Sequence, residues 1–469
     1  MTDVLVVGAG PAGVAAAIRS AQLGARTTLA TSGAFGGMAA NDGPVPVRTL
    51  AHAARLMREA RQLSAYGIEV GEPRLDYGRL LARVDEVVAA VGAQSALRPQ
   101  AEAAGVVIRE QVGPVRFAAA DTMESAAGER FRADSIILCT GGVSRRLEVP
   151  GAELVATHSD AWSLTEVPRS MLVIGAGATG LQVASVFNAF GTKVRLFQSG
   201  PRIIPTEDED VSAAVAEQMR RSDVEVHEGF GVIERFERTP AGIRMVYSRD
   251  GETLSAEAGL AVAAIGWTAE TAALNLAAAG VGTDARGFIA VDERQRTTAA
   301  HIWAAGDVTG GLMLAPQAMQ AGFAAATNAI RGEGTTARRE INPIGSFTDP
   351  EYAQVGLSEA AARVGHDVET AVAQFASVTR GIVDGRTVGF CKLIVDRADH
   401  RILGCHVVGD RAVDTAQIAA VAMAGGLTVD ALARLPLSFP TYAGVLARAA
   451  AGAAYRLNNG EGAVPTAVA

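Results

Sequence analysis

The sequence predicts an α/β protein with two Rossmann-like domains and a third, smaller domain of mixed strands and helices. Three observations carry this prediction. An apolar strand, a glycine turn and a helix follow one another at the N-terminus, and the same pattern returns near residue 171. Beyond residue 341, strand and helix patterns follow a different order. At 469 residues the chain is also too long for one core, since domains usually hold about 100–200 residues.

The first repeat begins with the apolar strand at residues 4–7 and continues into a helix at 14–18. Glycines in the turn between them let the backbone approach a pyrophosphate, whose charge then lies at the helix N-terminus. The predicted nucleotide contacts are Gly8, Gly10, Pro11, Ala12 and Gly13. The strand at 26–30 should end in an acid for the ribose hydroxyls, but that position is Thr31, which can still accept one hydrogen bond.

The second repeat places Gly175, Gly177 and Gly180 between a strand at 171–174 and a helix at 181–190. Its next strand ends at Gln198, which again lacks the acid typical of an unphosphorylated ribose site. Arg195 and Arg202 are near this position in sequence without a clear role toward a 2′-phosphate, so the choice between NADH and NADPH stays open. Two nucleotide folds in one chain imply a resident flavin facing a nicotinamide donor.

Composition and charge exclude several classes of partner. The net charge of −8, with scattered basic residues, disfavours nucleic acid and anionic membranes as partners. No run of about eighteen apolar residues occurs, and the chain enters a strand without a basic leader, so we expect a cytoplasmic protein acting on a small-molecule substrate. The spacings of Cys139, Cys391 and Cys405 fit neither a zinc site nor a dithiol motif, and we expect no disulfide and no metal.

Two further segments have simple interpretations. Residues 51–105 alternate apolar and charged positions at helical spacing, which predicts amphipathic helices that cover a sheet. The acidic run at 206–210 is interpreted as the solvated start of a helix, because acidic side chains favour helix N-termini.

Several more motifs point to one family when taken with the two glycine turns. They are Leu-Cys-Thr-Gly at 138–141, Ala-Ile-Gly at 264–266, the segment 297–308 that ends in Gly306 and Asp307, Phe-Thr-Asp-Pro-Glu at 347–351, Val-Gly-Leu-Ser-Glu at 355–359, and Arg-Ile-Leu-Gly at 401–404. In this order, the chain resembles the pyridine nucleotide-disulfide oxidoreductases, the flavoprotein group of dihydrolipoamide dehydrogenase, glutathione reductase and mercuric reductase.

This resemblance implies an α/β fold of two Rossmann-like dinucleotide-binding domains plus a C-terminal α+β dimerisation domain. The implied segments are an FAD-binding domain at 1–152 and 269–336, an NAD(P)-binding domain at 153–268, a dimerisation domain at 341–456 and a disordered tail at 457–469. The implied cofactors are FAD and either NADH or NADPH. The implied assembly is a homodimer in which the partner's C-terminal domain completes the site.

The resemblance also implies which residues contact the cofactors. Asp307 would bind the ribityl chain of the flavin, and Met313, Leu314 and Ala315 would lie near its ring; a carboxylate is well suited to hydroxyl recognition. The other implied contacts are Gly37, Met38, Arg48, Val115, Thr140, Gly141 and Gly306 for the flavin, and Gln182, Gln198 and Gly266 for the nicotinamide nucleotide.

The chain departs from the family where the chemistry takes place. In the family, reduced flavin passes electrons to a cysteine pair, but the corresponding positions here are Ala39 and Pro44, whose side chains cannot form a disulfide or a covalent adduct. The catalytic base and its orienting acid correspond to Phe439 and Gly444. Because both glycine turns are intact, these joint losses favour a changed mechanism over random decay.

Four residues are candidates for the altered site. Arg48 and Gln182 occupy the positions of a family lysine and glutamate beside the flavin. Arg48 keeps a positive charge that could stabilise reduced flavin or hold a substrate carboxylate or carbonyl, and Gln182 can bind a nicotinamide carboxamide. Phe439 and Tyr442 of the partner would line an apolar pocket; the alternative for both is ordinary packing at the dimer interface.

The resulting interpretation is an FAD-dependent NAD(P)H oxidoreductase without a dithiol relay. Electrons would pass directly between flavin and a small organic acceptor, such as a quinone or a conjugated metabolite. One alternative is a flavin-dependent dehydrogenase or oxidase of a small metabolite, with the opposite direction of electron flow. A second alternative is a non-catalytic dimeric scaffold. The sequence leaves the identity of the acceptor open.

Overall fold

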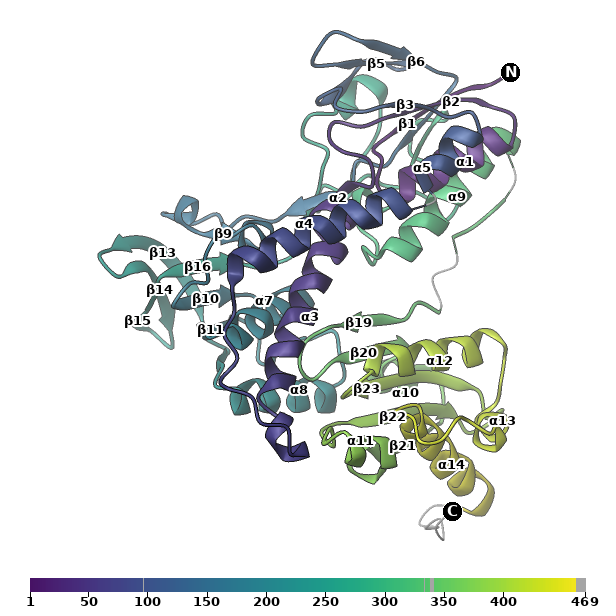
Figure 1. Ribbon diagram of the computed structural model, residues 1–469. Helices are drawn as coiled ribbons and strands as arrows, with labels where there is room; N and C mark the ends of the chain where they lie inside the picture. Colours follow the sequence, from purple (N-terminus) through teal and green to yellow (C-terminus); the bar gives the residue numbers. More distant parts are fainter. Residues whose placement is uncertain (96, 333, 338–340, 461–469) are drawn as a thin grey trace.

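The computed structural model describes residues 1–95, 97–332, 334–337 and 341–460. Figure 1 shows three lobes. The N-terminal segment and a later part of the chain share one lobe, a second lobe is inserted between those two pieces, and the C-terminal domain forms the third. This is the α/β architecture of two Rossmann-like domains plus a C-terminal α+β domain that the sequence predicts.

The first domain is built on a parallel sheet of strand order β18-β7-β1-β2-β3. Its strands are β1 (Asp3–Val7), β2 (Arg26–Ala30), β3 (Val107–Arg109), β7 (Ser135–Leu138) and β18 (Ile302–Ala304). Alternate side chains of the strands point to opposite faces, and each face is covered. Helices α1 (Pro11–Gln22), α5 (Leu97–Ala103) and α9 (Ala315–Arg331) cover one face. The antiparallel strands β4 (Val115–Ala119), β5 (Thr122–Ser125) and β6 (Arg130–Arg132) cover the other.

The second domain repeats this plan with strand order β12-β11-β10-β16-β9. Its strands are β9 (Ala156–Thr157), β10 (Ser170–Ile174), β11 (Lys193–Gln198), β12 (Glu225–Glu228) and β16 (Leu260–Ala263). Helices α6 (His158–Trp162), α7 (Ala178–Ala189) and α8 (Glu209–Arg221) cover one face, and β13 (Val232–Thr239), β14 (Gly242–Arg249) and β15 (Glu252–Ala258) cover the other. A short antiparallel pair, β8 (Gly142–Ser144) and β17 (Trp267–Ala269), lies where the chain enters and leaves this domain.

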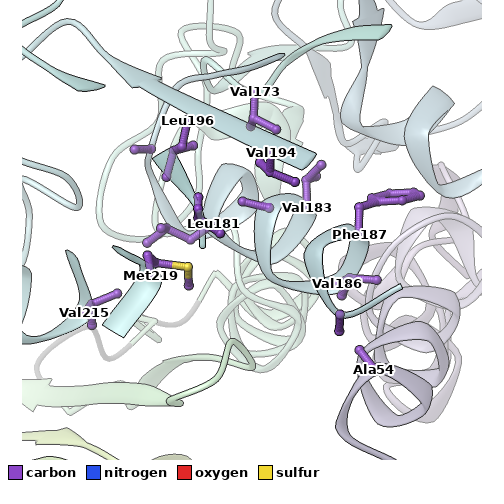
Figure 2. Packing of buried hydrophobic residues seen from close by; sticks show 14 of the residues in the cluster. Ala54, Val173, Leu181, Val183, Val186, Phe187, Val194, Leu196, Val215 and Met219 are labelled. Atoms are coloured by element: carbon purple, nitrogen blue, oxygen red, sulfur yellow. The ribbon is translucent and has the colours of Figure 1, made fainter. Parts of the chain in front are cut away.

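Helix α3 joins the domains. It follows the short helix α2 and precedes α4, with bounds α2 (Gly37–Asn41), α3 (Pro44–Ala60) and α4 (Tyr77–Gln94). Leu50 and Ala54 are fully buried on the face of α3 that packs on α7, and Figure 2 shows Ala54 next to Val186. One turn further, the Arg58 guanidinium donates to the Ser185 hydroxyl at 2.9 Å. Residues 51–60 and 77–94 are therefore the helices predicted from periodicity.

The C-terminal domain has an antiparallel sheet of order β19-β20-β23-β22-β21. Its strands are β19 (Ile344–Ser346), β20 (Tyr352–Gly356), β21 (Val368–Gln374), β22 (Phe390–Asp396) and β23 (Ile402–Val408), and its helices are α10 (Glu359–Gly365), α11 (Thr379–Val383), α12 (Ala412–Ala424), α13 (Val429–Arg434) and α14 (Gly444–Asn459). Strands β22 and β23 are buried along their whole length, because α12 and α14 pack on one face and Phe390 and Val408 join the core around α7 on the other.

The prediction of a disordered tail from residue 457 is wrong at its start. Helix α14 continues to Asn459, because Leu457 packs on the C-terminal core and the Asn458 amide donates to Asp430 at 2.8 Å. Residues 461–469 of that prediction lie outside the described residues. Within the described part of the chain, no helix is both long enough and apolar enough to cross a membrane.

The acidic run at 206–210 begins a helix as the sequence predicts, with Asp208 as the N-cap of α8, but the run is only partly solvated. Glu207 and Asp208 are 5% and 7% exposed, because this segment packs against the C-terminal domain. The buried Lys392 ammonium contacts the Asp208 carboxylate at 2.8 Å and the Asp210 carboxylate at 2.7 Å. The run therefore supplies an ion pair between the second domain and the C-terminal sheet. Removal of one partner from such a buried pair strongly destabilises the folded protein.

Glu207 gives the protein a pH-dependent stability that can be measured. Burial, with a contribution from the charge of Asp208, raises the Glu207 pKa from 4.5 to about 7. The native state therefore holds a proton that the unfolded chain releases, and stability falls as pH rises from about 4.5 to 7. Glu207→Gln mimics the protonated acid, so it should stabilise the protein by about 1–3 kcal/mol at pH 8 and change it little at pH 5.

Urea denaturation of both proteins at pH 5 and pH 8 measures this effect. Glu209→Gln is the matched control, because Glu209 lies two residues further along the chain and is exposed. An equal gain from both substitutions at pH 8 would contradict the assignment of the effect to buried Glu207.

Candidate functional site

The first glycine turn lies at the carboxyl ends of β1 and β7, where the backbone is packed too closely for larger residues. A Cβ atom on Gly8 would lie 2.1 Å from the Cys139 carbonyl oxygen, and one on Gly13 would lie 1.8 Å from the Gly8 carbonyl oxygen. Gly8 also has a φ of +103°, which favours glycine. These two glycines therefore position α1 directly against the strand ends.

Gly10 has the opposite environment. A Cβ atom added to Gly10 would meet nothing within 4 Å, although this residue is the N-cap of α1 and Pro11 follows it at the start of the helix. No side chain caps this end of α1, so the N-terminal N–H groups and the positive end of the helix dipole face open space. The turn has the shape and polarity that a pyrophosphate requires.

Three other segments converge on the same turn. Gly37 has a φ of +57°, and a Cβ there would lie 2.8 Å from the Gly10 Cα. Gly306 approaches Ala12 to a similar distance, because a Cβ added to Gly306 would lie 2.9 Å from the Ala12 methyl group. On the third segment, the Thr140 hydroxyl donates to the Glu270 carbonyl at 2.7 Å, and Gly141 has a φ of +86°. The predicted flavin contacts at 8–13, 37, 140–141 and 306 are thus neighbours in space.

Asp307 follows this convergence point with a largely buried carboxylate. Burial raises its pKa, and within the described residues no group donates a hydrogen bond to its side chain. Such a carboxylate is suited to the hydroxyl groups of a ribityl chain. Met313, with a φ of +55°, and Leu314 precede α9, and Ala315 is its first residue. The structure therefore places this predicted group along one short segment.

Two predicted contacts have other evident roles. Val115 is buried in the core between β4 and the first sheet, which accounts for its apolar side chain. Met38 lies on α2, where its carbonyl oxygen accepts from the amides of Asp42 and Gly43 at 3.0 and 2.7 Å.

The corner beside Thr31 contains an acid that the sequence reasoning missed. Thr31 directly follows β2, and its amide donates to the Arg109 carbonyl at 2.9 Å. Glu110 follows Arg109 in the chain, and its carboxylate accepts from the Phe35 amide at 2.8 Å and pairs with Arg98. The pairing with Arg98 and the Phe35 amide hold the Glu110 pKa below its usual value against the effect of burial. Nothing in the sequence marks Glu110, because the strand β3 that precedes it enters the sheet only through long-range pairing.

A second missed residue is Gln295. Its side chain is 1% exposed, and both its amide nitrogen and its amide oxygen lack a hydrogen-bond partner. It lines a cavity of about 20 Å³ together with Asp307 and Gln317, which is enough space for one water molecule. A buried unpaired carboxamide at this point identifies Gln295 as a polar neighbour of the Asp307 segment.

The second glycine turn repeats the geometry of the first. A Cβ on Gly175 would lie 2.4 Å from the Ala264 carbonyl oxygen, and one on Gly180 would lie 1.8 Å from the Gly175 carbonyl oxygen, whereas Gly177 faces open space. Gly266, with a φ of +104°, follows the end of β16 beside this turn. Gln198 ends β11, and its Oε1 accepts from the Ala176 amide at 3.0 Å.

The segment that carries Ala39 and Pro44 is held by hydrogen bonds around α2. The Asn41 side-chain amide donates to the Gly37 carbonyl at 2.8 Å, and the Gly36 amide donates to the Ala9 carbonyl at 2.9 Å. These bonds attach the segment to the first glycine turn. Ala39 is half-buried and Pro44 is exposed, with Pro44 at the start of α3.

Arg48 lies one turn after Pro44 on α3, with its guanidinium against the ring of Phe347. Its Nη1 is buried without a hydrogen-bond partner, and burial lowers its pKa to about 9, although the charge of Glu351 acts in the opposite direction. Gln182 lies in the first turns of α7, and its amide nitrogen is 3.4 Å from the Ala178 carbonyl oxygen. Within the described residues, no hydrogen bond joins Arg48 to Gln182.

Phe439 and Tyr442 have different environments. Phe439 is 80% exposed, so in one chain its ring has little apolar cover. Tyr442 donates its hydroxyl to Asp384 at 2.8 Å and packs near Phe375 of the same domain. It also lines a cavity of about 510 Å³ that the C-terminal domain forms with the end of α3, near Arg55.

All three cysteines are free thiols with buried side chains. Cys139 is buried, and burial raises its pKa to about 12. The sulfur atoms of Cys391 and Cys405 are 3.8 Å apart, but both side chains are fully buried in the C-terminal sheet. A buried, protonated thiol is a poor nucleophile.

Two dinucleotide-binding domains with paired glycine turns, followed by a separate α+β domain, define the class of two-nucleotide flavoproteins. The family model for pyridine nucleotide-disulphide oxidoreductases matches residues 2–322, and the model for the dimerisation domain of that family matches residues 342–450. The chain belongs to this family, whose members are FAD-containing, NAD(P)H-dependent oxidoreductases.

Individual relatives agree with this assignment. A dihydrolipoyl dehydrogenase of Chlorobaculum tepidum is 32% identical over 457 residues and covers 96% of each chain. A mercuric reductase of Bacillus cereus is 30% identical over 430 residues, which is 91% of this chain and 67% of that protein. Among solved structures, the HOCl-induced flavoprotein disulfide reductase RclA of Escherichia coli matches with a TM-score of 0.84 at 25% identity, over 96% of this chain and 99% of that one.

The glycine geometry predicts different results for two substitutions in the first turn. Gly10→Val should leave the fold intact, because the new side chain enters open space, but it should lower FAD content about tenfold or more by blocking the pyrophosphate. Gly13→Ala should instead destabilise the protein, because its Cβ would overlap the Gly8 carbonyl. Circular dichroism and flavin absorbance per chain measure both properties.

Gly177→Val is the matched control in the second turn. It should retain FAD and lose affinity for the nicotinamide nucleotide. Full FAD content in a folded Gly10→Val protein would contradict the placement of the flavin at the first turn.

Proposed function

We propose that this protein is an NAD(P)H-dependent flavin oxidoreductase without a dithiol relay, which transfers two electrons directly from reduced FAD to a small organic acceptor. The observation that supports this most is the replacement of both relay thiols by Ala39 and Pro44, while the remaining thiols are buried in other cores. The proposal departs from the disulfide chemistry in the names of the relatives, because that chemistry needs accessible thiols.

The flavin, when bound, supplies a two-electron store between nicotinamide and acceptor. The chain would hold it with the first glycine turn and Asp307, and would hold the nicotinamide nucleotide with the second turn. Ala39 and Pro44 leave a small apolar surface on α2 and the start of α3. Such a surface suits a planar acceptor that stacks without forming a covalent bond to the protein.

Arg48 would supply the one charge of this acceptor pocket. A buried guanidinium without an ion-pair partner is costly, and a bound anion or a developing negative charge would offset that cost. Its five donors in one plane fit a carboxylate or a quinone oxygen. Phe439, exposed in one chain, would cover the pocket of the partner subunit in a homodimer, through the dimerisation domain that the chain carries.

Anaerobic mixing tests the central proposal. NADH or NADPH should bleach the flavin absorbance of the purified protein, and a quinone such as menadione should restore it within one turnover. Lipoamide and glutathione disulfide should be reduced no faster than by free flavin, because no thiol lies at 39 or 44. Efficient reduction of either disulfide, or unchanged flavin spectra with both nicotinamides, would contradict the proposal.

Substitution of Arg48 separates function from stability. Arg48→Met should lower kcat/KM for the quinone about tenfold or more, because a hydrogen bond from a charged group contributes about 1.5–3 kcal/mol. Its unfolding free energy should be unchanged or higher, because the buried Nη1, which has no hydrogen-bond partner, is removed. Arg48→Lys, which keeps the charge, should fall between the two proteins in activity. Loss of stability without loss of activity would assign Arg48 to packing alone.

A further inference from the structure

We infer that the nicotinamide site of this chain selects NADH over NADPH, and that Gln198 and the loop after it determine this choice. The inference depends on family membership and on the second glycine turn, and it is independent of which acceptor the flavin reduces.

Gln198 is fixed in position by the glycine turn itself. It ends β11, the second strand of the domain, where residues that contact the adenosine ribose lie in this fold. Its Oε1 accepts from the Ala176 amide at 3.0 Å, so the side-chain nitrogen is directed to the other side, toward Gly200. This nitrogen can donate to a ribose hydroxyl, but as a neutral group it cannot balance the charge of a phosphate.

The arginines near Gln198 already have partners. Arg195 lies 3.0 Å from the Glu225 carboxylate. Arg202 donates to the Glu207 and Pro205 carbonyl oxygens at 2.6 and 3.0 Å, so it anchors the backbone of the loop that follows β11. Neither guanidinium is free to receive a 2′-phosphate without breaking contacts that hold this corner.

The Glu228 carboxylate, on the neighbouring strand β12, also has hydrogen-bond partners. Glu228 is paired in register with Gln198, and its two oxygens accept from the Ile203 amide at 2.9 Å and from Arg220 at 2.7 Å. Glu228 thereby neutralises Arg220, the third arginine at this corner. In the described part of this corner, Arg195 and Arg220 are paired with carboxylates, and backbone carbonyl oxygens accept from both Nη atoms of Arg202.

A 2′-phosphate would therefore lose water without gaining hydrogen bonds from a guanidinium whose donors are free. Hydrogen bonds to charged groups contribute about 1.5–3 kcal/mol each, so their absence corresponds to about a 10- to 100-fold weaker affinity for the phosphorylated nucleotide. The unphosphorylated ribose needs only neutral donors and acceptors, which Gln198 provides.

Binding to the oxidised holoenzyme tests this inference without any turnover. Calorimetric titration with NAD⁺ and NADP⁺ should give at least a tenfold lower Kd for NAD⁺, and the same order for ADP-ribose and 2′-phospho-ADP-ribose. Equal Kd values, tighter binding of NADP⁺, or failure of a folded, flavin-loaded protein to bind either nucleotide would overturn it. None of these outcomes depends on the acceptor, so a wrong acceptor class would leave the result unaffected.

Two variants test whether the lack of a free cationic side chain beside Gln198 causes the preference for NAD⁺. Ser199→Arg adds a cation at an exposed position beside Gln198, and it should tighten NADP⁺ binding about tenfold or more while NAD⁺ binding changes little. Thr253→Arg adds the same charge at an exposed position on β15 and is the matched control. Equal effects of the two substitutions on NADP⁺ would overturn the assignment to the Gln198 corner.

Discussion

Close backbone contact at the two glycine turns is the constraint on which the rest of the structure depends. In each turn, the first glycine lies against the backbone just after a neighbouring strand, and the last glycine lies against the first glycine. At both contacts, an added Cβ atom would overlap a carbonyl oxygen. These contacts fix the helix that follows, and the middle glycine of each turn is left facing open space. A tight backbone thus produces a vacant, positively polarised surface directly beside it.

Helix α3 extends this order from the flavin domain to the other two. It begins at Pro44, immediately after the segment attached to the first glycine turn, and its buried face packs on α7 of the nicotinamide domain. Its far end meets the C-terminal domain through Arg55 and Asp410, which lie 3.0 Å apart. A single helix therefore begins at Pro44 in the flavin domain and contacts both other domains.

The sequence predicts the fold well because glycine spacing and apolar strands are local signals, and the three domains follow from them. It predicts the convergence of Gly37, Gly306 and the first turn only through the family resemblance. It cannot place Glu207 in a buried site, since the covering residues lie far along the chain in the C-terminal domain. Gln295 and Glu110 were missed for the same reason: their surroundings are created by tertiary contacts, and their own sequence neighbourhoods are ordinary.

The contact of Lys392 with Asp208 has a consequence for how this architecture can be recombined. Dinucleotide domains are often regarded as interchangeable modules, but here the inserted domain supplies carboxylates to an ammonium that belongs to the C-terminal sheet. A chimera that receives a foreign insert at 153–268 would keep Lys392 and its partner Glu359 at 3.5 Å, but would lose the two nearer carboxylates. The inserted domain and the C-terminal domain are therefore constrained to change together, although the chain between them returns to the flavin domain.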